Sequence, residues 1–147
     1  MNTKKIIIGC DHAGYELKEK LKDYLTSMSY EVIDVGCHGL ESVDYPTFGF
    51  KVGEAVANNE ATYGVVVCGS GIGISIAANK VKGVRCANVF VEDHARLARL
   101  HNNANVIGFG ARFLSFEQAS SMLKIFLETE FEGNRHVKRV DLLDQYK

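Results

Sequence analysis

The sequence predicts an α/β protein in which one parallel β-sheet lies between two layers of helices. Five short apolar runs, rich in β-branched residues, recur along the chain at 5–9, 31–35, 63–68, 84–90 and 104–108. The runs are apolar at consecutive positions, so both faces of each strand are expected to be buried. Helix-like stretches separate them, and this alternation is typical of a parallel sheet covered on both sides.

The helices are expected at residues 15–27, 47–59, 92–101 and 116–128, with a further helix-compatible segment after the third strand. Leu17, Leu21 and Leu25 recur at helical spacing in the first of them. Ser115 and Gln118 have the spacing of a capping box, which begins the last of the four.

A final helix is expected over residues 135–147, where apolar side chains recur roughly every three positions. A helix added to a complete five-unit α/β domain often packs on a neighbouring subunit. The chain of 147 residues is expected to form a single domain, residues 1–147, because this length suits one core and no linker or repeat divides it.

Composition and charge exclude several classes of protein. The net charge of −1 gives no broad cationic surface for nucleic acid or an anionic membrane. Residues 1–9 hold too short an apolar run for a signal peptide, and no run approaches the roughly 18 apolar residues that span a bilayer. The four cysteines show no CxxC spacing, which disfavours a disulfide framework or a zinc site. The protein is therefore expected in the cytoplasm.

Polar residues follow four of the expected strands, at the carboxyl edge where open α/β sheets bind ligands. They lie at 9–14, 68–71, 92–94 and 108–112. Such groups recurring at one edge are a more specific signal than any one of them alone.

A glycine-rich loop follows the third expected strand, with glycine at 69, 71 and 73, and a helix begins beyond it. A loop of this kind gathers backbone N–H groups at the positive end of the helix dipole, which favours anions. Cys68 lies at the edge of this nest, where a thiol ionises more readily than usual. The pattern favours a cysteine base or nucleophile beside an anion cradle. The alternatives are that Cys68 is a packing residue and that the glycines serve only close helix–strand contact.

Charged side chains elsewhere suit a phosphate. Arg135 and Arg139 share one helical face, and like charges at that spacing cost roughly a few tenths of a kcal/mol. With His136 beside the first, the pair suits a phosphate dianion, although a solvated basic face is the alternative. The simpler alternative for Asp11 is that it caps a helix. The simpler alternative for His101 is that it complements a helix dipole. The inventory fits chemistry on a small phosphorylated metabolite without naming the reaction.

These residues closely resemble the ribose-5-phosphate isomerase B family, which also includes galactose-6-phosphate and allose-6-phosphate isomerases. The resemblance covers essentially the whole chain. It rests on residues 9–14 (GCDHAG), 44–46 (DYP), 68–73 (CGSGIG) with 76–80 (IAANK), 101–105 (HNNAN), and 133–136 (GNRH) with Arg139. It implies a Rossmann-like three-layer α/β/α fold, no metal or other cofactor, and a phosphorylated sugar substrate. It also implies a homodimer or dimer of dimers in which two subunits share each active site.

The resemblance further implies roles in catalysis. Cys68 would be the base that moves a proton between C1 and C2 of the open-chain sugar. The backbone N–H groups of Gly69, Ser70, Gly71, Ile72 and Gly73 would hold the enediolate oxygens. The Ser70 hydroxyl would shuttle a proton between O1 and O2. His101 of a partner subunit would open the furanose ring with Asp11 facing it, and Asn102 would hold a sugar oxygen.

Substrate binding is implied for a second group of residues. The family's phosphate clamp is matched here by His12, Arg112, Arg135 and Arg139, with His136 beside them. Tyr45 resembles a residue that forms one wall of the family's sugar pocket. Another branch of the family uses a glutamate six positions after the site that matches Cys68. That position here is Ile74, which cannot take a proton, so Cys68 is the only credible base in this chain.

Other functions compete with a five-carbon aldose–ketose isomerase. A six-carbon sugar 6-phosphate, allose or galactose 6-phosphate, is the alternative substrate. A non-catalytic sugar-phosphate sensor would need neither Cys68 nor His101. A dinucleotide enzyme would carry GxGxxG after its first strand, and residues 9–14 do not match it. A Cys-His hydrolase is a further alternative, but it would not explain the pairing of Arg135 and Arg139 in the C-terminal segment.

Overall fold

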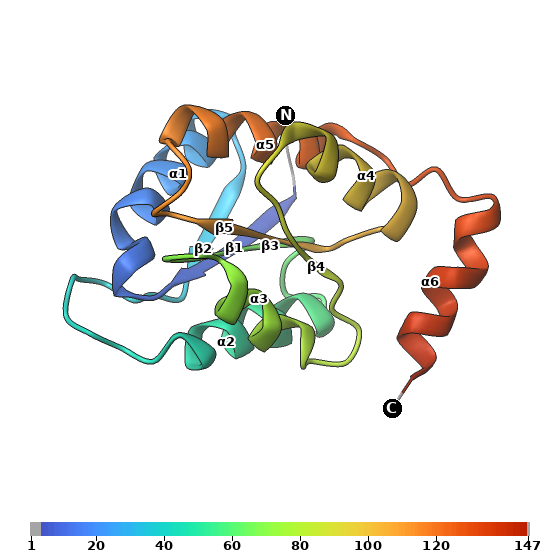
Figure 1. Ribbon diagram of the computed structural model, residues 1–147, viewed down its shortest axis with the longest axis horizontal. Helices are drawn as coiled ribbons and strands as arrows, with labels where there is room; N and C mark the ends of the chain where they lie inside the picture. Colours follow the sequence, from blue (N-terminus) through green and yellow to red (C-terminus); the bar gives the residue numbers. More distant parts are fainter. Residues whose placement is uncertain (1–3, 147) are drawn as a thin grey trace.

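A computed structural model describes residues 4–146, and its five strands form one parallel sheet between two helical layers (Figure 1). The strands are β1 (Lys5–Cys10), β2 (Glu31–Asp34), β3 (Tyr63–Cys68), β4 (Cys86–Asn88) and β5 (Val106–Gly110). Their order across the sheet is β2-β1-β3-β5-β4. The predicted five-stranded parallel sheet is confirmed, although β4 is shorter than the apolar run that predicted it.

The helices are α1 (Tyr15–Ser27), α2 (Tyr45–Ala57), α3 (Ile72–Asn79), α4 (Glu92–Asn102), α5 (Phe116–Glu128) and α6 (Arg135–Gln145), with a 3₁₀ turn at His12–Gly14 before the first. Helices α1, α4 and α5 cover one face of the sheet and α2 with α3 the other (Figure 1). The predicted capping box of Ser115 and Gln118 is present. Helix α2 begins two residues earlier than predicted, because Pro46 is accommodated in its first turn. Lys147, the last residue of the predicted tail helix, lies outside the described residues.

Two hydrophobic clusters form the core, one on each face of the sheet. Every residue of β3 is buried. Val65 and Val67 face the cluster under α1 and α5, whereas Val66 and Cys68 face the cluster under α2 and α3. Because successive side chains of a strand point to opposite faces, a strand between two cores must be apolar at every position. Across residues 4–146, no helix is long and apolar enough to cross a membrane.

Strands β1 and β3 lie side by side, and the chain leaves them toward opposite faces of the sheet. The segment after β1 enters α1, and the segment after β3 enters α3 (Figure 1). The Asp11 N–H donates to the Val67 carbonyl at 3.1 Å. A Cβ on Gly14 would lie 2.5 Å from the same carbonyl oxygen, so only glycine allows this close approach. The edge at which the chain leaves β1 and β3 toward opposite faces is the topological switch point, where open sheets bind ligands.

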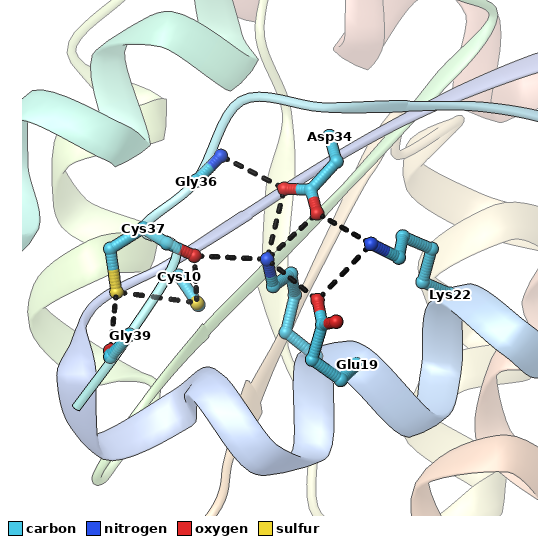
Figure 2. Close-up of polar contacts among 8 residues, drawn as sticks. Cys10, Glu19, Lys22, Asp34, Gly36, Cys37 and Gly39 are labelled. Carbon is cyan, nitrogen blue, oxygen red and sulfur yellow. Dashed lines mark hydrogen bonds and ion pairs between the residues drawn. The ribbon is translucent and has the colours of Figure 1, made fainter.

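A network of polar contacts around Asp34 and Cys37 lies at the end of β1 (Figure 2). Lys18 of α1 is fully buried, and its Nζ donates to both Asp34 carboxylate oxygens at 3.0 and 2.8 Å and to the Cys37 carbonyl at 2.9 Å. Asp34 Oδ1 also accepts the Gly36 N–H. Gly36 and Cys37 in turn bond the backbone of Cys10. The network thus fixes the residue that immediately precedes Asp11.

The charges of this network depend on one another. Burial alone would lower the pKa of Lys18, but its bonds to Asp34 and Glu19 outweigh that effect and raise it. Burial alone would raise the pKa of Asp34, but hydrogen bonds from Lys18, Gly36 and Lys22 outweigh it and lower the pKa. Both members of the ion pair are therefore charged near neutral pH, and each stabilises the charged form of the other.

The variant Lys18→Met is expected to lower the free energy of unfolding by about 3–5 kcal/mol, because it leaves the largely buried Asp34 carboxylate, 13% exposed, without its main partner. Lys22→Met is the matched control, since Lys22 also contacts Asp34 at 3.0 Å but is 31% exposed. Its cost is expected to be under about 1 kcal/mol. Urea denaturation of the three proteins measures both values. Equal losses in the two variants would contradict the special role of Lys18.

Candidate active site

The predicted site residues separate into two groups at opposite edges of the sheet. The first group lies at the carboxyl edge and is called here the carboxyl-edge half-site; it consists of Asp11, His12, Tyr45, Cys68, residues 69–73 and Arg112. Cys68 ends β3, Asp11 follows β1, and Arg112 follows β5, so three neighbouring strands deliver them together. The sheet topology therefore gathers side chains that are distant in sequence.

Cys68 is 5% exposed, and its sulfur accepts a hydrogen bond from the Gly71 N–H at 3.1 Å. The next N–H of the loop, that of Ile72, donates to the Ser70 hydroxyl at 3.1 Å. The glycine-rich loop thus turns two backbone donors toward the two side chains for which the family resemblance implies proton transfer. Beyond this turn α3 begins, with the positive end of its dipole at the loop.

Glycine is required at position 71 of this loop for two reasons. Gly71 has φ of +80°, and a Cβ there would lie 2.6 Å from Asn88 Oδ1 and 2.8 Å from the backbone of Phe109. At the flanking glycines the obstacles are side chains of the predicted site. A Cβ on Gly69 would lie 2.9 Å from the Arg112 guanidinium, and one on Gly73 would lie 2.6 Å from the Tyr45 ring.

These contacts place two predicted binding residues directly against the loop. The Arg112 side chain brings a cation beside Gly69, and the Tyr45 ring stands over Gly73 at the start of α3. Both residues are exposed on their outer sides, so they flank the loop without closing it. Close packing against the backbone explains Gly71, whereas Gly69 and Gly73 leave room for two side chains that are predicted to bind substrate.

Asp11 does serve as a helix cap, because its Oδ1 accepts the Gly14 N–H at 3.1 Å. The side chain is nevertheless positioned at the switch point, and its residue is 8% exposed. The neighbouring His12 accepts the Val43 N–H on Nδ1 at 3.1 Å. In the neutral ring the proton therefore lies on Nε2, which leaves that nitrogen as the donor.

The second group is called here the helix half-site and consists of His101, Asn102, Arg135, His136 and Arg139. It lies where α4 ends and α6 begins. The carbonyl of Asn102 accepts a bond from Arg85, which immediately precedes β4, so this group is at the amino edge of the sheet. A single chain therefore does not bring His101 to Cys68.

Within the helix half-site the imidazoles of His101 and His136 stack, with ring centroids 4.2 Å apart and planes 13° from parallel. Glu132 lies 3.7 Å from His101 Nε2 and 4.0 Å from Arg135 Nη1. Burial, followed by the charges of Arg135 and His101, lowers the pKa of His136. The neutral form of His136 is favoured, which limits repulsion between the stacked rings.

One group among the described residues has the spacing of metal ligands. The donor atoms of His101, Glu132 and His136 lie within 4.8 Å of one another. The two stacked rings, however, direct their lone pairs along parallel planes, so a shared ion would need one ring to rotate. The site was predicted without a metal, and this arrangement is better suited to holding His101 in place than to convergent coordination.

Sequence reasoning missed two residues beside these groups. Asn88, at the end of β4, places its side-chain oxygen against Gly71, where it accepts no bond from the residues that the structure describes. The rule of strand ends pointed instead to residues 92–94, which are exposed in the first turn of α4. Glu132 was missed because it belongs to the break before α6, where no spacing marks it.

Comparison with known proteins gives one consistent result. The model of the Ribose/Galactose Isomerase family matches residues 6–143. The chain is similar to the solved structure of a ribose-5-phosphate isomerase B from Clostridium thermocellum, with 49% identity, a TM-score of 0.95, and 96% of this chain and 95% of the other covered.

Two further proteins resemble it closely. A ribose-5-phosphate isomerase B from Mycoplasma genitalium, solved with bound ribulose-5-phosphate, is 38% identical with a TM-score of 0.95, covering 99% of this chain and 97% of the other. The galactose-6-phosphate isomerase subunit LacB of Clostridium acetobutylicum is 41% identical over 94% of this chain and 82% of its own.

Proposed function

The chain belongs to the Ribose/Galactose Isomerase family, and from that premise we propose that it interconverts ribose 5-phosphate and ribulose 5-phosphate. It is a sugar-phosphate isomerase. The observation that carries the proposal is the Cys68 sulfur at the switch point, bonded by the Gly71 N–H of a loop that is rich in further donors. Ile74, in the position where a glutamate base stands in another branch, is apolar and fully buried.

In the proposed reaction the Cys68 thiolate takes the proton from C2 of the open-chain aldose and returns it to C1. The electrons released at C2 form the C1–C2 double bond of the enediolate, and O1 takes up the negative charge. Ser70 moves a proton from O2 to O1 as the ketose carbonyl forms. Backbone N–H groups from Gly69 to Gly73 hold the developing charge, which is where preorganised donors contribute most.

The arginines suit the far end of the substrate. Arg112 stands beside the loop, while Arg135 and Arg139 extend from exposed positions of α6. His12 and His136 complete the proposed phosphate clamp, since each can donate from an imidazole nitrogen. Tyr45 limits the pocket between the loop and the solvent, and Asn102 is proposed to hold a sugar oxygen.

Two copies of the chain are proposed to share each site, as a homodimer or a dimer of dimers. The reason is that one chain holds the carboxyl-edge half-site and the helix half-site at opposite edges. Exposed apolar side chains accompany both: Ile72 and Ile76 on α3 are 54% and 55% exposed, and Leu142 and Leu143 on α6 are 58% and 57% exposed. Such surfaces favour association. His101 of the second copy would then face Asp11 and open the ring, in an enzyme proposed to work in the cytoplasm.

A six-carbon sugar 6-phosphate remains the second candidate substrate, because the galactose-6-phosphate isomerase subunit is similar over most of the chain. This chain carries both Cys68 and His101, which favours a self-sufficient enzyme over one of two complementary subunits. Measuring the isomerisation of ribose 5-phosphate, allose 6-phosphate and galactose 6-phosphate under the same conditions decides between the substrates.

The first test follows isomerisation of ribose 5-phosphate in deuterated water. Ribulose 5-phosphate is expected to form with solvent deuterium at C1, because the proton held on the Cys68 sulfur can exchange with water before it returns to carbon. Cys68→Ala is expected to lower kcat by about a thousand-fold, the size of a lost general base. Cys86→Ala is the matched control and should keep full activity. Equal turnover by Cys68→Ala and the parent would refute the mechanism.

Ring opening is tested separately with His101→Ala. Its kcat/KM on ribose 5-phosphate is expected to fall by about a hundred-fold, because the furanose must open before isomerisation. A four-carbon aldose 4-phosphate cannot close a furanose ring, so the loss there is expected to stay below about three-fold. Comparable losses on the two substrates would show that His101 acts in another step.

The shared site is tested by mixing inactive variants. Cys68→Ala and His101→Ala damage different half-sites, so co-expressed chains are expected to regain activity in about a quarter of their sites by random pairing. Cys68→Ala with Arg112→Ala is the matched control, because both changes fall in the carboxyl-edge half-site and each mixed pair has no intact site. Activity measurements on co-purified protein decide this. Failure of the first mixture to exceed the second would rule out sharing.

A further inference from the structure

Helix α6 carries the two arginines proposed to bind phosphate, yet it stands apart from the sheet and from most of the other helices (Figure 1). Among the residues that the structure describes, contacts made by three of its side chains attach it to the rest of the chain. His136 stacks on His101 near its start, Val140 is buried at its middle, and Asp144 pairs with Arg85 near its end. Within a single chain, the orientation of α6 therefore depends on few side chains.

Arg85 is well placed to fix one end of this helix. Its own backbone N–H donates to Asn105 Oδ1 at 2.8 Å, which holds it at the entrance to β4. The guanidinium donates from Nε and Nη2 to the Asn103 carbonyl, and from Nε to that of Asn102. Nη1 donates to Asp144 Oδ1 at 2.7 Å. One planar fork thus joins the last carbonyls of α4 to the last turn of α6.

The last turn of α6 borders a hollow of about 590 Å³, which residues 79–87 line on the other side. Leu143, Asp144 and Tyr146 contribute the helix side of this hollow. Among the described residues, the ion pair with Arg85 is the polar contact that spans it. The Arg85 side chain is 15% exposed and that of Asp144 is 40% exposed, so water competes with the bond only in part.

We propose that Arg85 and Asp144 are positioning residues for phosphate binding, because their ion pair sets the angle at which α6 presents Arg135 and Arg139. The helix has 11 residues and is therefore about 16 Å long, so a small tilt about Val140 moves its first turn by an ångström or more. A displacement of that size weakens the hydrogen bonds from Arg135 and Arg139 to a phosphate, because such bonds need a fixed geometry. The inference rests on the proposed function, because it assigns a purpose to the phosphate clamp.

The test compares Asp144→Ala with Asp141→Ala, which removes an exposed aspartate from the same helix. Asp144→Ala is expected to raise KM for ribose 5-phosphate by about ten-fold and to leave kcat within about two-fold, the pattern of a lost binding contact. The inhibition constant of inorganic phosphate is expected to rise in parallel. Asp144→Glu should restore most of the affinity, and Asp141→Ala should resemble the parent.

Equal KM values for Asp144→Ala and Asp141→Ala would overturn the inference, as would a fall in kcat with KM unchanged. If Asp144→Ala lowers the melting temperature strongly, Arg85→Lys provides the second variant, because it keeps the charge but loses the fork. The same rise in KM is expected from it, and an unchanged KM overturns the inference. If the parent does not isomerise ribose 5-phosphate, the proposed function fails, and calorimetric binding of inorganic phosphate to parent and Asp144→Ala still tests the ion pair.

Discussion

The parallel pairing of β1 with β3 is the constraint on which the site depends. Cys10 pairs with Val67 in this register, so Asp11, which follows β1, and Cys68, which ends β3, meet at one edge. The two loops can leave toward opposite faces only because Gly14 lets the chain pass against the β3 carbonyl. The ion pair of Lys18 and Asp34 stabilises the end of β1. The chemistry therefore rests on a framework that packing and a buried ion pair have already fixed.

Much of this could be predicted from sequence, because the signals are local. The strands between two cores must be continuously apolar, and the 63–68 run shows this directly. The first helix was predicted with the bounds that α1 has, since its leucines repeat at helical spacing. The carboxyl-edge rule placed Cys68 and Arg112 on the same side. Such reasoning succeeds where a residue's environment follows from its near neighbours.

The residues that escaped prediction depend on distant partners. Lys18 belongs to a helix whose other lysines are exposed or half-buried, and its burial depends on partners that include Asp34, sixteen positions away. Glu132 and Arg85 act through elements that meet only after folding. The separation of the two half-sites is likewise invisible in the motifs, because it follows from the direction in which α4 runs back across the sheet. The family resemblance supplied that expectation, and the topology gives it a physical reason.

The Gly71 and Ile72 donors already bond the Cys68 sulfur and the Ser70 hydroxyl. An incoming enediolate oxygen would therefore replace one acceptor by another instead of stripping water from bare amides. Exchange of this kind costs little in either direction, since each donor keeps a partner throughout. In the proposed reaction the loop would then hold a short-lived anion without retaining the neutral product.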